Sequence, residues 1–327
     1  MKRIALVRLT ALGDIINTAI VLQLIKKYYP DAQIEWICEE AFAPILYDHP
    51  DLYAVHSVAI KRIKKEKNLS LLNETIHKLR SLEKYDLIID MQGLLKSAIT
   101  ARFIGKNIHG YDRTSAREGV ASLFYRTHSS IPYDENIIRR NCRLVAEALN
   151  IKFTDQNILD KKPLFSIGKR PNFLAINKPN IALVIGASWP SKIYPKEQYA
   201  VLCKMIDANF FVVWGSDTER KEADWIVAQS KNVSTAPKLS LSELTTFIGH
   251  MDLTIGSDTG PTHLAWALNR PSITLFGPTT PRMIYETAIN IPVESNSIVD
   301  IHRIDKNDFS IQKISPATIA DVAKGLL

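Results

Sequence analysis

The sequence predicts an α/β protein made of two doubly wound, Rossmann-like domains, and three observations support this prediction. Short apolar runs alternate with segments in which apolar residues recur at helical spacing, which is typical of a mostly parallel sheet covered by helices on both faces. The chain has 327 residues and is 46% hydrophobic, which is enough for two ordinary cores. A segment rich in Pro, Asn, Gly and Lys, from 165 to 180, interrupts the alternation. We therefore expect domains at 1–170 and 171–327, with the ligand cleft between them.

The first domain begins with a strand, a loop and a helix. Ile4 to Leu9 is a short, mostly apolar run, and the segment 14–28 carries apolar residues at helical spacing. The same patterns continue along the domain. They predict a strand over 34–38, a helix over 69–82, a strand over 87–90 and a helix over about 94–104.

The alternation restarts after the linker. A strand is expected over 181–185, followed by a helix over 196–207, a strand over 210–214, helices over 218–230 and 241–250, a strand over 253–255, a helix over about 262–268 and a strand over 272–276. A terminal helix over about 315–327 is expected to pack back on the first domain. The carboxyl ends of the strands are where such sheets bind ligands.

The charge distribution indicates where an anionic partner binds. The net charge is +7, and residues 1–170 hold 27 Lys and Arg against 19 Asp and Glu, whereas residues 171–327 hold 14 against 15. The basic first half fits a nucleic acid, a phosphorylated or carboxylated substrate, or an acidic membrane surface. Sparse aromatic residues near the most basic stretch argue against single-stranded nucleic acid, which needs stacking platforms as well as charge.

Several protein classes are excluded by absent patterns. Cys38, Cys142 and Cys203 lie far apart without a CxxC pair, which suggests neither a zinc site nor a disulfide framework. No apolar run reaches the length of a membrane span, and Arg8 and Asp14 interrupt the only candidate for a signal peptide. We expect a cytoplasmic protein whose contact with a membrane, if any, is peripheral.

Asp14 is the first candidate functional residue. Gly13 allows a tight turn after the first strand, and the carboxylate follows at the mouth of the next helix. Spacing alone favours the capping of that helix, and the alternative is a carboxylate that faces a cleft at the carboxyl end of a strand. Neither GxGxxG nor GxxxxGK[ST] occurs, so the dinucleotide and P-loop interpretations lose support.

The segment from Gly256 to His263, GSDTGPTH, is the strongest local signal. Its two glycines let a ligand approach the backbone, and Pro261 suits a first helical position. Exposed amides at the start of the helix then form a site for a diphosphate. The alternative is a helix capped by Ser257 or Asp258, but this leaves the combination of Asp, Thr, Gly and His unexplained.

The stretch from Lys61 to Lys67 contains five basic residues in seven. Such runs are usually solvated surface, and its place in the basic half makes an anionic acceptor the alternative.

Five segments together resemble the lipopolysaccharide heptosyltransferases of glycosyltransferase family 9. These segments are LVRLTALGDII, IIDMQGLLKSA, AREGVASLFY, VVWGS and GSDTGPTHLAWALNRPSITLFGPTTP, and they run in order from Met1 to about Pro281. The resemblance implies a GT-B fold with the donor on the second domain and the acceptor on the first. It also implies an inverting transfer of heptose from ADP-heptose to the inner Kdo of Kdo2-lipid A, on the cytoplasmic face of the inner membrane, without a metal or other cofactor.

The resemblance assigns roles by position. Asp14 matches the candidate general base, which takes the proton of the acceptor hydroxyl as its oxygen attacks the anomeric carbon. Lys192 matches a lysine on the donor phosphates, and Glu219 matches an acid that holds the ribose. The donor loop corresponds to Asp258, Thr259, Gly260 and His263. The acceptor residues correspond to Lys61, Arg62, Lys64, Lys65, Lys96 and Arg117.

One departure and three alternatives accompany this interpretation. Ala187 and Ser188 stand where close relatives have paired threonines, so one hydroxyl is missing and Ser188 supplies the other. The alternative inside the family is an enzyme with the same donor and a later core acceptor. Outside it stand a non-catalytic nucleotide-sugar-binding protein, which the retained Asp14 and donor loop disfavour, and an RNA-binding module, for which no signature occurs.

Overall fold

The computed structural model describes residues 2–174 and 176–327, which form two compact units. The first unit spans Met1–Leu164 and the second spans Phe165–Leu327. The division falls at the start of the predicted linker, slightly before the predicted boundary after residue 170. Each unit contains one six-stranded sheet in which all the paired strands are parallel.

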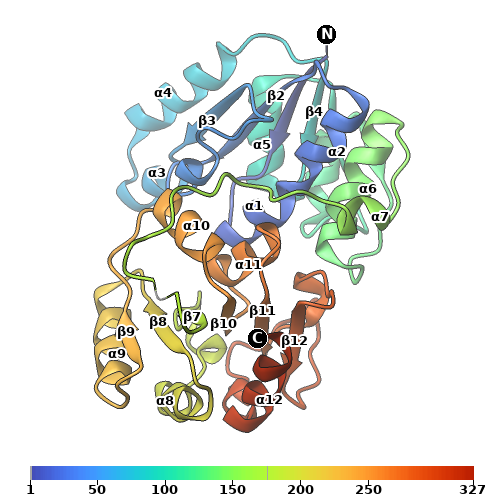
Figure 1. The fold of residues 1–327 in the computed structure, drawn as a ribbon. Coiled ribbons are helices and arrows are strands. Elements are labelled where there is room, and N and C mark those ends of the chain that lie inside the picture. The colour runs from blue at the N-terminus through green and yellow to red at the C-terminus, as the bar shows by residue number, and fades with distance from the viewer. Residues whose placement is uncertain (1, 175) are drawn as a thin grey trace. The chain divides into compact units, whose positions relative to one another are not determined.

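The first sheet has the order β3-β2-β1-β4-β5-β6. Figure 1 labels its strands β2, β3 and β4. Its strands are β1 (Arg3–Val7), β2 (Gln33–Glu39), β3 (Ala54–Val58), β4 (Leu87–Asp90), β5 (Ile108–Tyr111) and β6 (Thr127–Ser129). Its helices are α1 (Leu12–Thr18), α2 (Ile20–Tyr28), α3 (Ile60–Glu66), α4 (Leu69–Arg80), α5 (Leu95–Ile104), α6 (Ile137–Leu149) and α7 (Gln156–Leu159), with 3-10 turns η1 (Ala43–Ile45) and η2 (Gly119–Phe124).

The second sheet has the order β12-β11-β10-β7-β8-β9. Its strands are β7 (Asn180–Val184), β8 (Asn209–Val213), β9 (Val233–Thr235), β10 (Leu253–Ser257), β11 (Ser272–Phe276) and β12 (Asn290–Glu294). Its helices are α8 (Lys196–Met205), α9 (Asp217–Val227), α10 (Leu241–Gly249), α11 (Gly260–Ala267) and α12 (Pro316–Leu326), with 3-10 turns η3 (Pro190–Lys192), η4 (Pro281–Met283) and η5 (Ser310–Lys313).

The two sheets share one topology. Numbered from the first strand of each unit, both have the order 3-2-1-4-5-6 that is typical of doubly wound nucleotide-binding folds. The strand order reverses direction between β1 and β4 in the first unit and between β7 and β10 in the second. The ends of these four strands are therefore where each unit is expected to bind a ligand.

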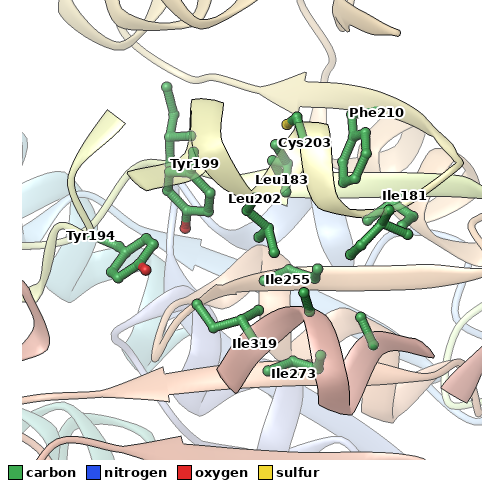
Figure 2. Packing of buried hydrophobic residues seen from close by; sticks show 14 of the residues in the cluster. Ile181, Leu183, Tyr194, Tyr199, Leu202, Cys203, Phe210, Ile255, Ile273 and Ile319 are labelled. Atoms are coloured by element: carbon green, nitrogen blue, oxygen red, sulfur yellow. The ribbon is translucent and has the colours of Figure 1, made fainter. Parts of the chain in front are cut away.

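Burial on both faces explains why the central strands show no regular alternation of apolar and polar residues. Every residue of β7 and of β10 is buried. Figure 2 shows Leu183 and Ile255 of these strands within a cluster to which α8 contributes Leu202. A strand that is buried on both faces needs no polar alternation, which is why the prediction found these strands easily.

The structure corrects some predicted elements. The helix expected over 14–28 is two helices, which meet at Ala19. The buried residues Ile319, Ala320 and Ala323 of the C-terminal helix α12 belong to the core of the second unit. The sequence analysis did not predict the elements β3, α3, β5, β6, α6, α7, β9 and β12.

Candidate functional site

Asp14 lies in the first turn of α1, immediately beyond the carboxyl end of β1. Its Oδ2 accepts a hydrogen bond from the backbone N–H of Ala11 at 3.0 Å, so the carboxylate does cap its own helix. Its Oδ1 lies 2.8 Å from the guanidinium of Arg8, which is itself buried and also donates to the carbonyl of Met91. The carboxylate remains partly exposed, so it is both anchored and accessible.

The loop before Asp14 is held by residues that follow β4. Gln92 accepts hydrogen bonds from the N–H groups of Leu9 at 2.8 Å and Thr10 at 3.3 Å, and its amide donates to the Thr10 hydroxyl at 3.0 Å. The ammonium of Lys96, on α5, donates to the same hydroxyl at 3.0 Å. The strand ends on either side of the topological switch are thus joined by direct hydrogen bonds, which fix the position from which Asp14 projects.

Asp90, the last residue of β4, organises the second of these loops. Its fully buried carboxylate accepts from the N–H of Gln92 at 2.9 Å, the hydroxyl of Ser97 at 2.8 Å and the hydroxyl of Tyr125 at 2.7 Å. Burial raises the pKa of this carboxyl, although these donors oppose the shift. Because its oxygens are enclosed by protein donors, we interpret Asp90 as a support for the loop.

Three of the predicted acceptor residues lie in one electrostatic environment. Burial lowers the pKa of Lys96, Glu39 and Glu118 raise it, and Lys61 and Arg117 lower it further. Lys61 and Arg117 therefore each lie near enough to Lys96 to repel its charge. We call Lys61, Lys96 and Arg117 the cationic cluster.

The other basic residues of α3 have different surroundings. Arg62 pairs with Glu40 at 3.1 Å, and both side chains are exposed. Lys64 and Lys65 are exposed on the last turn of α3. Lys61 differs because its N–H donates to the buried Glu39 at 2.8 Å and its ammonium lies 4.7 Å from the centre of the Phe42 ring.

In the second unit, three predicted donor residues meet in a buried group. The ammonium of Lys192 lies 2.7 Å from Oδ2 of Asp258, and Nε2 of His263 lies 2.9 Å from its Oδ1. Burial would raise the pKa of the Asp258 carboxyl, but Lys192 and His263 together hold it well below the usual range. We call these residues the Lys-Asp-His group. They come from η3, from the end of β10 and from α11, and so they join the two strand ends at the second topological switch.

Several polar atoms around this group are buried without a hydrogen-bond partner in the part of the chain that the structure describes. They are Nδ1 of His263, Nε1 of Trp189 and the hydroxyls of Ser191 and Ser257. Buried polar atoms normally have a partner, and an unsatisfied group costs about 1–3 kcal/mol. A polar ligand bound at the carboxyl edge of this sheet would supply partners for groups that the protein leaves unpaired.

The donor loop runs from β10 into α11 differently from its predicted form. The helix begins at Gly260, with Thr259 as the N-cap, so neither Ser257 nor Asp258 caps it and Pro261 is not the first helical residue. Asp258 is instead enclosed by its two partners. The first amides of an α-helix lack intrahelical acceptors and attract anions, so the N-terminus of α11 suits a phosphate.

Glu219 reaches back from α9 to the ends of β7 and β8. Its Oε2 accepts from the N–H of Gly215 at 2.7 Å. A Cβ at Gly186 would lie 2.7 Å from the Glu219 carboxylate, so the carboxylate could not keep its present position over a larger residue. Ser188 is exposed two residues further along the same loop.

Three further features of the structure concern metal-binding groups, membrane-spanning helices and the cysteines. Within residues 2–174 and 176–327, no group of three or more His, Cys, Asp or Glu side chains is arranged to hold a metal ion. The same residues contain no helix that is long and apolar enough to cross a membrane. The three cysteines are free and buried.

Sequence reasoning missed the residues that hold the candidate site in place. The motifs LVRLTALGD and IIDMQG were noted as sequence, but Arg8, Asp90 and Gln92 received no role. One available signal was a charged residue at the end of an apolar strand, as in Arg8 and Asp90, because strand ends in such sheets face the ligand. No local signal identifies Ser191, because its environment depends on distant elements, and Ser257 was singled out only as a possible N-cap of the following helix.

Two solved structures of E. coli heptosyltransferases have the same fold as this chain. E. coli heptosyltransferase WaaC with ADP matches with a TM-score of 0.82 and 24% identity over 99% of this chain and 100% of that chain. E. coli ADP-heptose lps heptosyltransferase II matches with a TM-score of 0.72 and 20% identity over 100% of this chain and 98% of that chain. The fold is therefore that of a GT-B glycosyltransferase. The chain belongs to glycosyltransferase family 9, the heptosyltransferases, whose family model matches residues 74–315.

Two curated relatives of this chain carry the name of the same member of the family. Lipopolysaccharide heptosyltransferase 1 of Campylobacter coli is 38% identical over 99% of this chain and 98% of that protein. The protein of the same name from Pseudomonas aeruginosa is 34% identical over 85% of this chain and 79% of its own length. These similarities confirm the family predicted from the sequence motifs, and they agree with a resemblance to heptosyltransferase I in particular.

Proposed function

We propose that this enzyme transfers L-glycero-D-manno-heptose from ADP-heptose to the inner Kdo of Kdo2-lipid A, with inversion at the anomeric carbon. The observation that carries the acceptor assignment is the cationic cluster, which joins through Lys96 and Thr10 to the loop that bears Asp14. An acceptor that carries carboxylates and phosphates suits this charge. The similarity to relatives named lipopolysaccharide heptosyltransferase 1 supports the same assignment.

The second unit binds the donor in this proposal. Two related structures contain ADP and ADP-2-deoxy-2-fluoro heptose, which supports a nucleotide-heptose donor. An ammonium has three N–H donors, and one of those of Lys192 is used by Asp258. The others are available for the diphosphate, together with the amides of Thr259 and Gly260. Glu219 of α9 then contacts the ribose, and Ser188, in the loop after β7, contacts the phosphates.

Each catalytic step uses a residue of this chain. Asp14, as the carboxylate, takes the proton from the acceptor hydroxyl while that oxygen forms the new bond to the anomeric carbon. The bond to the ADP oxygen breaks as the new bond forms, and attack from the opposite face inverts the configuration. Lys192 and the N-terminus of α11 stabilise the negative charge that develops on the departing diphosphate.

The proposed acceptor also determines where the enzyme works and which residues bind the acceptor. Kdo2-lipid A is a lipid, so we propose peripheral contact with the anionic cytoplasmic face of the inner membrane. Lys61, Arg62, Lys64, Lys65, Lys96 and Arg117 bind the acceptor in this scheme. No metal, cofactor or nucleic acid takes part.

A transfer assay tests the proposal. The enzyme is incubated with ADP-heptose and Kdo2-lipid A, and ADP release and the mass of the lipid product are measured. We expect one heptose added per acceptor, and NMR of the new linkage should give the anomeric configuration opposite to that of the donor. Transfer only to an acceptor that already carries heptose would replace the assignment with a later step in core assembly.

A further inference from the structure

Four exposed aliphatic side chains lie on two neighbouring elements of the first unit. On α5, Leu95 is 38% exposed and Ile99 is 37% exposed. On η2, Val120 is 56% exposed and Leu123 is 81% exposed. Single exposed aliphatic residues are ordinary, but four on adjoining elements form a surface that needs an explanation. We call these four residues the aliphatic patch.

The geometry of the two elements brings the patch together. Leu95 and Ile99 are four residues apart on an α-helix, so they project from one face. Val120 and Leu123 are three residues apart on a 3-10 turn, in which such residues are eclipsed. The Leu95 N–H donates to the Glu118 carboxylate at 2.7 Å, which joins the start of α5 to the start of η2.

Exposed basic residues lie on the same segments of the chain as the aliphatic patch. Between residues 94 and 130 the chain has six Lys and Arg against two Asp and Glu. Arg102 continues the exposed face of α5 beyond Ile99, and Arg126 follows three residues after Leu123; both are exposed. Arg113 is also exposed, and its side chain lies against Gly119 at the start of η2. An apolar surface with a basic rim is complementary to an anionic lipid bilayer, which offers acyl chains below a layer of phosphates.

We propose that the aliphatic patch is the surface by which this enzyme docks on an anionic lipid bilayer. Val120 and Leu123 enter the boundary between head groups and acyl chains, and Arg102, Arg113 and Arg126 contact lipid phosphates. This inference rests on the proposed function, since it names the surface that brings the enzyme to an acceptor embedded in a membrane. Four side chains are too few for a stable dimer, which buries about 800 Å² on each partner.

Two kinds of interaction contribute to the binding. Removal of a leucine side chain from the apolar layer should weaken partition by about tenfold or more. Each arginine near an anionic surface should contribute about fivefold, and this part should decrease as salt screens the charge. A surface of this size gives reversible binding, which suits an enzyme that must leave one acceptor for the next.

Vesicle sedimentation without any acceptor tests the docking surface separately from the reaction. The full-length protein is mixed with phosphatidylcholine vesicles that contain or lack phosphatidylglycerol. The variants are Leu123→Ser, Val120→Ser and Arg126→Gln, and the matched control is Leu159→Ser, an equally simple change at an aliphatic residue that is 54% exposed on α7. We expect binding to the anionic vesicles, a loss of about tenfold in Leu123→Ser, a smaller and salt-dependent loss in Arg126→Gln, and no change in Leu159→Ser.

Transfer assays separate the outcomes. Each variant should retain wild-type transfer to a deacylated, water-soluble acceptor, which also shows that it is folded, and should lose transfer to acceptor in vesicles. Equal vesicle binding by wild type and Leu123→Ser would overturn the docking surface, as would a change in oligomeric state that explains the loss. If vesicle binding depends on the patch but the wild-type enzyme transfers no heptose to Kdo2-lipid A, the proposed acceptor fails and the docking surface stands.

Discussion

The carboxylate of Asp14 and the guanidinium of Arg8 form a 2.8 Å ion pair that spans the turn between β1 and α1. Arg8 is buried and also donates to the Met91 carbonyl, beyond the end of β4, so the pair ties Asp14 to the neighbouring strand as well as to its own. The same carboxylate caps α1 through Ala11. A capping role and a catalytic role are therefore compatible in one residue, and variants must separate them.

Asp14→Asn separates capping from proton transfer. Asparagine keeps a side-chain oxygen that can accept the Ala11 N–H, but it cannot take a proton from the acceptor hydroxyl. We expect kcat to decrease by about 10² to 10⁴ in both Asp14→Asn and Asp14→Ala. Only the alanine variant should also lose the cap, which costs about 1 kcal/mol of stability beyond the loss of the ion pair. Steady-state kinetics measure the effect on turnover, and thermal unfolding measures the effect on stability. Near-normal turnover in Asp14→Asn would show that Asp14 caps the helix but is not the general base.

The Lys-Asp-His group predicts a large effect on stability as well as on donor binding. Lys192→Met leaves the buried Asp258 carboxylate without its ammonium, and breaking such a pair costs about 3–5 kcal/mol. The double variant Lys192→Met/Asp258→Asn should regain part of this loss, because no buried charge is left unpaired. ADP binding by calorimetry should weaken in both. Lys196→Met, which removes an exposed pair with Glu222, is the control and should change neither quantity much. If the losses of stability from the two substitutions simply added up in the double variant, this would contradict the coupling between Lys192 and Asp258.

Lys61 and Arg62 should differ although they are adjacent and both basic. Lys61 belongs to the cationic cluster, whereas Arg62 is already paired with Glu40. We expect Lys61→Ala to raise the acceptor KM several-fold more than Arg62→Ala does, with the larger increase at low salt, because exposed charges are screened over about 10 Å at 0.1 M ionic strength. The donor KM should stay constant in both. Equal effects of the two variants, or an effect on the donor KM, would remove the cluster from acceptor binding.

His109 predicts a pH dependence of stability. Its Nδ1 lies 2.9 Å from the Thr127 hydroxyl and its Nε2 lies 2.8 Å from the Ser129 hydroxyl. Burial, with a smaller contribution from His128, lowers its pKa from 6.5 to about 4. Between these values the unfolded chain binds a proton that the folded protein does not, so the free energy of unfolding decreases as the pH is lowered from 6.5 towards 4, by about 3 kcal/mol at most.

Urea unfolding of wild type and His109→Gln at several values between pH 7 and pH 4.5 measures this effect. The variant should show a shallower decrease of stability with falling pH, and the remaining slope reports other groups, such as His49, whose pKa is also lowered by burial. Parallel curves for the two proteins would show that His109 does not titrate in this range.

The sequence predicted the sheet centres better than their edges. β1, β7, β10 and β11 are almost wholly buried and are short runs rich in apolar residues, so length and composition identify them. The edge strand β3 is mostly half-buried and contains His56 and Ser57, so it has no such signal. The helix α6 was missed although its inner face is apolar, because buried Arg140 and Asn141 interrupt the pattern; Arg140 donates to the carbonyls of Ser115 and Ile131.

The residues of the candidate site also fall into those that the sequence identified and those that it did not. Asp258 and His263 lie within one recognisable motif, whereas Lys192 was assigned only by its position in the resemblance, and their meeting follows from strand ends that adjoin at the switch point. The roles of Gln92 and Glu39 could not be predicted, because each depends on contacts with residues far away in the sequence. The aliphatic patch was also invisible to sequence reasoning, since an apolar residue on a helix is ordinarily expected to be buried.

The close approach of Gly186 and Glu219 has a consequence for how sequences in this family can vary. The carboxylate is held by the Gly215 N–H and occupies the space that a Cβ at position 186 would need. A mutation that adds a side chain at 186 must therefore move the carboxylate at 219 away from the Gly215 N–H, although the acid itself can stay because a glutamate side chain can rotate. We expect homologues with a larger residue at 186 to hold this acid in another position, even though the two residues lie on different strand–helix units.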